Sequence, residues 1–122
     1  MDADKRLCGR DLESPFIELA VEVFSMLADA PRVRIVLALR EGELSVNRLA
    51  DLVDKSPVAV SQRLAKLRLS RIVTTRHDGT RVFYRLADEH ASRLVSGAIF
   101  QAEHAVTNAP AHHQSALGQG AR

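Results

Sequence analysis

Apolar positions recur at helical spacing through the first third of the chain, after a polar segment over residues 1–14. Residues 16–27 present one broad apolar face, which predicts an amphipathic helix. Asp29 is suited to cap a second helix that has Pro31 in its first turn. This second helix is apolar at most positions, so we expect it to be buried on most sides and to end at residues 41–43.

Two short helices joined by a tight turn follow. Ser45 is placed to cap the first of them, and Ser56 with Pro57 opens the second, which continues to about Leu69. The apolar residues that share one face of the second helix are Val60, Leu64 and Leu67. The polar residues of this helix are left for its other faces. Two short helices with such a turn are typical of a helix-turn-helix.

A β-hairpin is predicted directly after this pair of helices. Two β-rich runs within residues 72–86 flank Asp78-Gly79, and such a dipeptide is a strong hairpin signal. A hairpin in this position is the wing of a winged helix. The basic side chains that its tip would project are Arg76, His77 and Arg81.

These elements predict a mainly α fold with a β-hairpin wing, a winged helix-turn-helix. A last amphipathic helix runs from about residue 88 to residue 105. We expect a flexible arm over residues 1–14, one winged-helix domain over residues 15–106, and a histidine-containing tail over residues 107–122. The apolar faces of the first and last helices exceed what so small a domain covers by itself, which makes them a candidate interface.

Composition excludes several classes of protein. The chain has 122 residues, 46% of them apolar, which suits a single globular domain with a small core. It contains neither a run of roughly 18 apolar residues nor a signal-peptide stretch, so we expect no membrane partner. Its single cysteine, Cys8, cannot form an intrachain disulfide. A cytoplasmic location is the natural expectation.

Positive charge is concentrated in residues 55–85, which contain the second helix of the helix-turn-helix and the predicted hairpin. Residues 55–85 hold eight Lys or Arg residues and one acid, Asp78, which gives this segment +7 although the whole chain carries only +2. Such a block indicates a polyanionic partner, here double-stranded DNA. Ser61 and Gln62 are suited to base edges, whereas Arg63 and Lys66 are suited to phosphates. The full predicted set is Ser56, Val58, Ser61, Gln62, Arg63, Lys66, Arg76 and Arg81.

Four of the five histidines lie in residues 88–113, together with carboxylates. Imidazole and carboxylate groups are ligands that nickel, cobalt and zinc accept. His90 and His104 are 14 residues apart, hence roughly 21 Å apart along one helix, so one chain cannot bring both to one ion. Two antiparallel copies can, because residue 90 of one helix then lies beside residue 104 of the other. Asp88 is either a ligand or the cap of this helix.

Several segments in order resemble the ArsR/SmtB family of bacterial metal-sensing repressors. The segments are residues 23–35 (VFSMLADAPRVRI), 45–50 (SVNRLA), 61–67 (SQRLAKL) and 78–86 (DGTRVFYRL). The resemblance implies a homodimer of winged helices that pairs through its first and last helices and binds a palindromic operator. Many members carry His at the position of Arg63, so this departure leaves the DNA sequence preference open.

The resemblance also bears on the metal. One group of members binds metal through cysteines at positions that hold Ser45 and Asn47 here, so soft thiophilic ions lose their ligands. The zinc-sensing pattern is met at Asp88 and His90 but has Gln101 where His is expected. The nickel- and cobalt-sensing subgroup is similar at five positions, which imply the ligand set His90, Glu103, His104, His112 and His113.

We therefore expect a metal-responsive repressor, released from DNA by Ni(II) or Co(II), that controls a metal efflux gene. One alternative is a zinc sensor that uses Asp88, His90 and His104. Another is a winged-helix DNA-binding regulator that senses no metal. An enzyme is not expected, since the chain has no nucleophile–base pair and no phosphate loop, and no organic cofactor is expected either.

Overall fold

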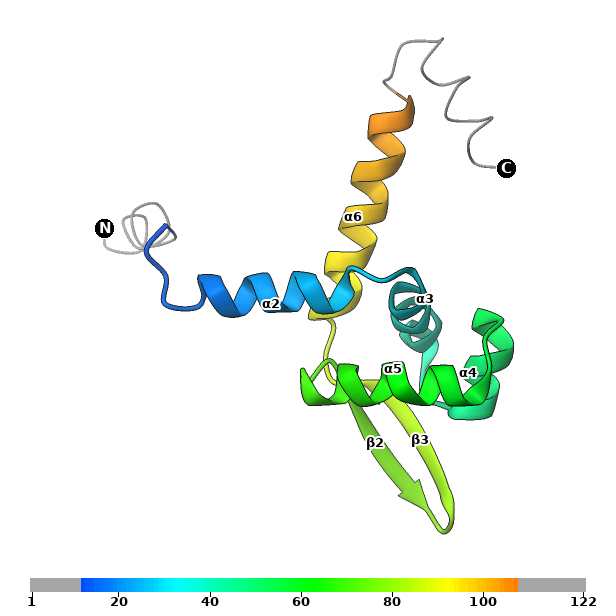
Figure 1. Cartoon of the computed structure of the whole chain (residues 1–122). Coiled ribbons are helices and arrows are strands. Elements are labelled where there is room, and N and C mark those ends of the chain that lie inside the picture. The colour runs from blue at the N-terminus through cyan, green and yellow to red at the C-terminus, as the bar shows by residue number, and fades with distance from the viewer. Residues whose placement is uncertain (1–11, 108–122) are drawn as a thin grey trace. The chain divides into compact units, whose positions relative to one another are not determined.

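The computed structural model describes residues 12–107 (Figure 1). The first elements of this described part are α2 (Ile17–Leu27), α3 (Ala30–Ala38) and a short 3-10 turn, η1 (Leu39–Glu41). Asp29 caps α3 because its carboxylate accepts the backbone N–H of Arg32 at 3.1 Å. Both helices and the cap of the second were predicted from the sequence, and both are confirmed.

The helix-turn-helix consists of α4 (Val46–Val53) and α5 (Pro57–Leu69), as predicted. Ser45 caps α4 by accepting the N–H of Arg48 at 3.2 Å, and Ser56 caps α5 by accepting the N–H of Ala59 at 3.1 Å. Asp54 ends α4 in the left-handed conformation, with φ 57°. These local hydrogen bonds set the short turn between the two helices.

A three-stranded antiparallel sheet follows, with the strand order β1-β3-β2. The wing is formed by β2 (Val73–Asp78) and β3 (Arg81–Leu86), and β1 (Leu44–Ser45) pairs with β3. The hairpin was predicted, whereas β1 was not. Asp78 pairs with Arg81, so the two turn residues are Gly79 and Thr80 rather than Asp78 and Gly79. Gly79 supplies the positive φ of 64° that this turn requires.

The core lies between α3, α4, α5 and the base of the hairpin. The side chains that are almost completely buried are Ile35, Val36, Leu49, Val60, Leu64, Leu67 and Val73. By contrast, α2 leaves most of its apolar face uncovered, since Leu19 is 53% exposed and Phe24 is 60% exposed. A hollow of about 680 Å³ between α2 and the end of α5 belongs to this uncovered region.

The last helix, α6 (His90–Thr107), belongs to a second compact unit that begins at Asp88. The carboxylate of Asp88 accepts the N–H of His90 at 2.8 Å and so satisfies a free donor at the start of α6. Ala91 and Val95 are buried, whereas the apolar side chains of Leu94, Ile99, Phe100 and Val106 are exposed. The described helices include none that is long and apolar enough to cross a membrane.

The C-terminus of α5 has an unusual residue in a common motif. The N–H of Ile72 donates to the carbonyl of Leu67 and the N–H of Arg71 to that of Arg68, a Schellman motif. Arg71 occupies the left-handed position, with φ 62°, which glycine normally fills. The side chain of Arg71 therefore imposes a local backbone cost at the boundary between α5 and the wing.

We expect Arg71→Gly to raise the free energy of unfolding by about 0.5–1 kcal/mol, because glycine adopts positive φ without the steric cost. Urea unfolding at pH 7 measures this change. Ser70→Gly is the matched control, because Ser70 has φ −84° and gains nothing from glycine. An unchanged or lowered stability of Arg71→Gly would show that the arginine side chain compensates for its backbone.

Candidate functional site

One exposed face of α5 carries half of the residues predicted to bind DNA. Val58, Ser61, Gln62 and Lys66 are all exposed and recur at helical spacing, opposite the buried face of the helix. The chemistry of this face is suited to a groove, because it offers an apolar contact, a hydroxyl, an amide and a cation. Ser56 differs from them, because its hydroxyl oxygen is already occupied as the cap of α5.

Arg63 does not point freely outward as a phosphate contact would. Its Nε donates to the carboxylate of Asp29 at 3.0 Å, and the two side chains are 30% and 25% exposed. Asp29 thus both caps α3 and holds a side chain of α5. Sequence reasoning assigned Asp29 the first role only, because no local pattern connects residues that lie 34 positions apart.

The environment of Asp29 favours its ionised form. Desolvation raises the pKa of this carboxyl, but hydrogen bonds from Arg63 and from the backbone of Arg32, with the charges of both, hold the pKa below its ordinary value of 3.8. Arg32 also donates to the carbonyl of Met26 at 2.8 Å. The junction of α2 and α3 is therefore connected to α5 by charged hydrogen bonds.

The wing carries a second ion pair. Arg76 Nε lies 2.9 and 3.0 Å from the two carboxylate oxygens of Glu43, and its Nη2 also donates to Glu43. The guanidinium groups of Arg76 and Arg81 each lie 4.9 Å from the ring centre of Phe83. The hydrogen bond from Arg76 lowers the pKa of Glu43, and the same hydrogen bond raises the pKa of Arg76. Sequence reasoning missed Glu43 and Phe83.

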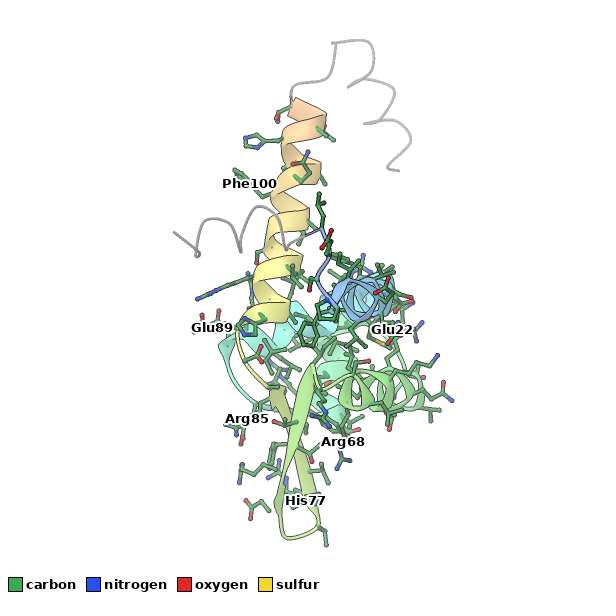
Figure 2. The ribbon with its side chains drawn as sticks, turned by 90° about the vertical axis from the view of Figure 1, so that its left-hand side faces the viewer. Glu22, Arg68, His77, Arg85, Glu89 and Phe100 are labelled. Atoms are coloured by element: carbon green, nitrogen blue, oxygen red, sulfur yellow. The ribbon has the colours of Figure 1, made fainter. Side chains whose placement is uncertain are left out.

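Histidine at position 77 lies near the far end of the hairpin (Figure 2) and is exposed. Its side chain is on the opposite face of the wing from Arg76, since neighbouring strand residues alternate in direction. It therefore shares no contact with the ion pair of Arg76 and Glu43, and it lies on a different element from His90 and His104.

The predicted metal ligands fall on α6 as far as the structure describes them. His90, Glu103 and His104 are exposed, and the ring of His104 packs edge-on against Phe100 with 4.2 Å between the ring centres (Figure 2). No three His, Cys, Asp or Glu side chains within residues 12–107 converge on a common point. His112 and His113 lie outside the described residues.

The donor chemistry of these residues nevertheless fits the ion expected from the sequence. Imidazole nitrogen and carboxylate oxygen suit Ni(II), Co(II) and Zn(II). α6 is one unbroken helix from residue 90 to residue 107, which maintains the separation of its two histidines. A complete site therefore requires ligands from a second chain, from the residues beyond 107, or from both.

Three comparisons place the chain among known proteins. A family model described as "Bacterial regulatory protein, arsR family" matches residues 29–75. The chain is 55% identical over 100 residues to the HTH-type transcriptional regulator KmtR of Mycobacterium tuberculosis, covering 82% of this chain and 77% of that protein. It is 37% identical over 86 residues to the HTH-type transcriptional repressor SmtB of the same species, and the match covers 70% of this chain and 64% of SmtB.

A solved structure agrees with the fold. The solution structure of a homodimeric winged helix-turn-helix DNA-binding domain from Mycobacterium bovis, a possible ArsR-family transcriptional regulator, matches with a TM-score of 0.70 and 26% identity. The match covers 81% of this chain and 92% of that one. The predicted winged helix-turn-helix is confirmed, and the similar proteins are regulators rather than enzymes, as expected.

Asp29→Asn tests the ion pair separately from the cap, since asparagine caps helices about as well as aspartate. We expect the variant to lose about 1 kcal/mol of unfolding free energy at pH 7. The pKa of folded Asp29 is depressed, so its contribution is present above the unfolded value of 3.8 and is lost as pH falls through the folded value. Urea unfolding of both proteins from pH 7 to pH 2.5 measures the difference.

The gap between wild type and Asp29→Asn should therefore be constant above about pH 5 and should close in acid. Asp51→Asn is the matched control, because Asp51 is an exposed carboxylate of α4 that forms no ion pair within residues 12–107. A gap that persists undiminished at pH 2.5 would mean that Asp29 acts through its shape rather than its charge.

Proposed function

The chain belongs to the ArsR family of bacterial regulatory proteins, and we propose that it is a metal-responsive repressor of that family. In this proposal a homodimer binds a palindromic operator through α5 and the wing, and Ni(II) or Co(II) causes its release. The observation that carries the proposal is that one chain holds both an exposed face of α5 suited to a DNA groove and two exposed histidines near opposite ends of α6. A metal efflux gene is the proposed target.

The DNA side of the proposal rests on the outward face of α5. Its exposed side chains can reach base edges, while its buried apolar face fixes the helix against the core. Gln62 is suited to a bidentate contact with adenine, and Val58 is suited to the methyl group of thymine. Lys66 lies farther along the same face and is suited to a phosphate.

The homodimer is supported by apolar surface that the single chain leaves open. Leu19, Val21 and Phe24 of α2 are each more than half exposed, and Phe100 of α6 is 59% exposed. Large apolar side chains in this number on two helices mark an interaction surface. A second copy of the chain is the proposed occupant, in keeping with the homodimeric state of the similar Mycobacterium bovis domain.

The metal side of the proposal rests on the length of α6. His90 and His104 are separated by 14 residues, roughly 21 Å along the axis but close to four whole turns, so they share nearly one face. Two antiparallel copies of α6 would bring His90 of one chain beside His104 and Glu103 of the other. His112 and His113 are the proposed remaining ligands from the tail.

Such a shared site explains how binding could control DNA. A bound ion accepts lone pairs from both chains at once, so it is bound more tightly by one dimer geometry than by another. The recognition helices of the two chains must match successive major grooves, which only a limited range of dimer geometries permits. Differential binding of typically 1–3 kcal/mol is enough to shift operator occupancy.

Two alternatives remain as outcomes of the test. A zinc sensor would use Asp88, His90 and His104, but the carboxylate of Asp88 is engaged with the backbone N–H of His90. This observation favours the cap over the ligand for Asp88. A regulator that senses no metal would bind DNA through the same face of α5, and the histidines of α6 would bind no metal ion.

We expect Ni(II) and Co(II) to release the wild-type protein from DNA upstream of its own gene, and His90→Ala/His104→Ala to remain bound at the metal concentrations that release the wild type. Fluorescence anisotropy of the labelled duplex, at equal free Ni(II), Co(II) and Zn(II), measures release. The double substitution removes two imidazole ligands, so it should raise the metal concentration needed for release by more than tenfold.

His77→Ala is the matched control, because it removes an exposed histidine of the wing and leaves α6 intact. This variant should respond to metal as the wild type does. Release by Zn(II) at the lowest free concentration would support the zinc alternative. DNA binding that no metal changes would refute the sensor and leave a plain winged-helix regulator.

A mixture of two single variants tests whether the site is shared between chains. His90→Ala and His104→Ala should each fail to respond alone. In their heterodimer the His90 of one chain meets the His104 of the other, which restores one complete site and leaves the second without either histidine. Random exchange in a 1:1 mixture makes half of the dimers heterodimers, so we expect the mixture to recover metal binding at about a quarter of the wild-type stoichiometry.

Isothermal titration calorimetry of the mixture, after subunits have exchanged, measures the stoichiometry. Each single variant measured by itself is the control, because both sites of its homodimer lack one imidazole. A mixture that binds no more metal than the single variants would show that each chain builds its metal site alone.

A further inference from the structure

Two arginines of the wing, Arg76 and Arg81, differ in whether their hydrogen-bond donors are already used by a carboxylate. Arg76 presents its Nε and Nη2 edge to both oxygens of Glu43, and this edge is one of those that can hold a phosphate in a bidentate contact. A phosphate of DNA can bind Arg76 through this edge only by displacing the carboxylate. The hydrogen bonds that Arg76 would form with a phosphate are therefore offset by those that it would lose with Glu43.

Arg81 keeps its donors available. Within residues 12–107 it has no carboxylate in ion-pair distance, and its guanidinium stacks on Phe83 with 4.9 Å to the ring centre. Stacking uses the face of the planar group and leaves its N–H edges free. Arg81 also borders a hollow of about 270 Å³ with Ser45 and Asn47, on the side where α4 begins.

Both arginines lie on one face of the hairpin and share the same aromatic ring, so their difference comes from Glu43. Glu43 stands just before β1 and reaches Arg76 of β2, a separation of 33 residues. The pair is moderately exposed, with 50% of the Arg76 side chain and 34% of the Glu43 side chain accessible. A DNA backbone could therefore approach it.

We propose that Glu43 is a specificity-determining residue, which withholds Arg76 from the DNA backbone and leaves Arg81 as the phosphate contact of the wing. The proposal rests on the DNA binding proposed above. Phosphate contacts strengthen binding to every sequence alike. Withholding one of them lowers non-specific binding and gives more weight to the base contacts of α5.

The salt dependence of DNA binding reports on phosphate contacts, because the slope of log K against log salt changes by about 0.9 per contact. A dimer has two wings, so one contact per wing amounts to about 1.8. We expect Arg81→Gln to flatten the slope by about this amount and Arg76→Gln to leave it unchanged. Glu43→Gln should steepen the slope by a similar amount, because it frees Arg76.

Glu43→Gln should also tighten binding to a random duplex more than binding to the upstream duplex, so the ratio of the two affinities falls. The double variant Glu43→Gln/Arg76→Gln should return to the wild-type slope, since no arginine is left to free. Glu41→Gln, with the same change of charge two residues away on η1, is the control and should change neither quantity.

Two results would overturn the proposal. Arg76→Gln could flatten the slope as much as Arg81→Gln does, which would make Arg76 a phosphate contact in its own right. The steepening by Glu43→Gln could persist in the Arg76→Gln background, which would reduce Glu43 to a general negative charge. Melting curves establish that each variant is folded. A folded wild type that binds neither duplex would instead refute the proposed DNA binding.

Discussion

The packing of α5 against α3 and α4 is the constraint on which the rest of this structure depends. Val60, Leu64 and Leu67 are completely buried, and they fix the rotation of the helix about its axis. Once that rotation is fixed, helical geometry decides that Ser61 and Gln62 face outward. The core therefore determines which residues form the proposed DNA-reading face.

Arginines at the edge of α5 and on the wing form ion pairs instead, because carboxylates of neighbouring elements lie within hydrogen-bond distance of them. Arg63 reaches the cap of α3 and Arg76 of the wing reaches Glu43. Both carboxylates come from outside the basic segment of residues 55–85. The net charge of that segment is therefore larger than the charge that it offers to a phosphate backbone. Charge summed along a sequence measures long-range attraction, whereas ion pairs decide which cations can bind a phosphate.

The parts of this fold that the sequence predicted are those set by neighbours in the chain. The caps at Asp29, Ser45 and Ser56 and the apolar face of α5 all follow from residues within a few positions of one another. Strand β1 was not predicted because two residues are too few to show alternation of apolar and polar positions. It is recognised as a strand by its pairing with β3. The turn at Gly79 was shifted by one position, since strand register and not the dipeptide decides its centre.

The candidate site divides in the same way. Residues on the outer face of α5 could be named from periodicity, whereas the pairs of Asp29 with Arg63 and of Glu43 with Arg76 join residues more than 30 positions apart. Such pairs depend on how elements pack, which no local pattern encodes. Glu43 and Phe83 have ordinary sequence surroundings, so only the folded chain reveals that they surround Arg76.

The length of α6 places a physical limit on any effector that acts through its histidines. A rigid helix keeps His90 and His104 roughly 21 Å apart, so a single ion can coordinate both kinds of histidine only where the α6 helices of two chains meet. A ligand held within one chain contacts no group of the other chain, so it could change the spacing of the recognition helices only by first changing the conformation of its own chain. A ligand held between chains must favour one geometry, because its own coordination distances are short and fixed. If these histidines bind the effector, control of DNA binding follows from where they sit on the helix, and the DNA-binding face needs no metal ligand.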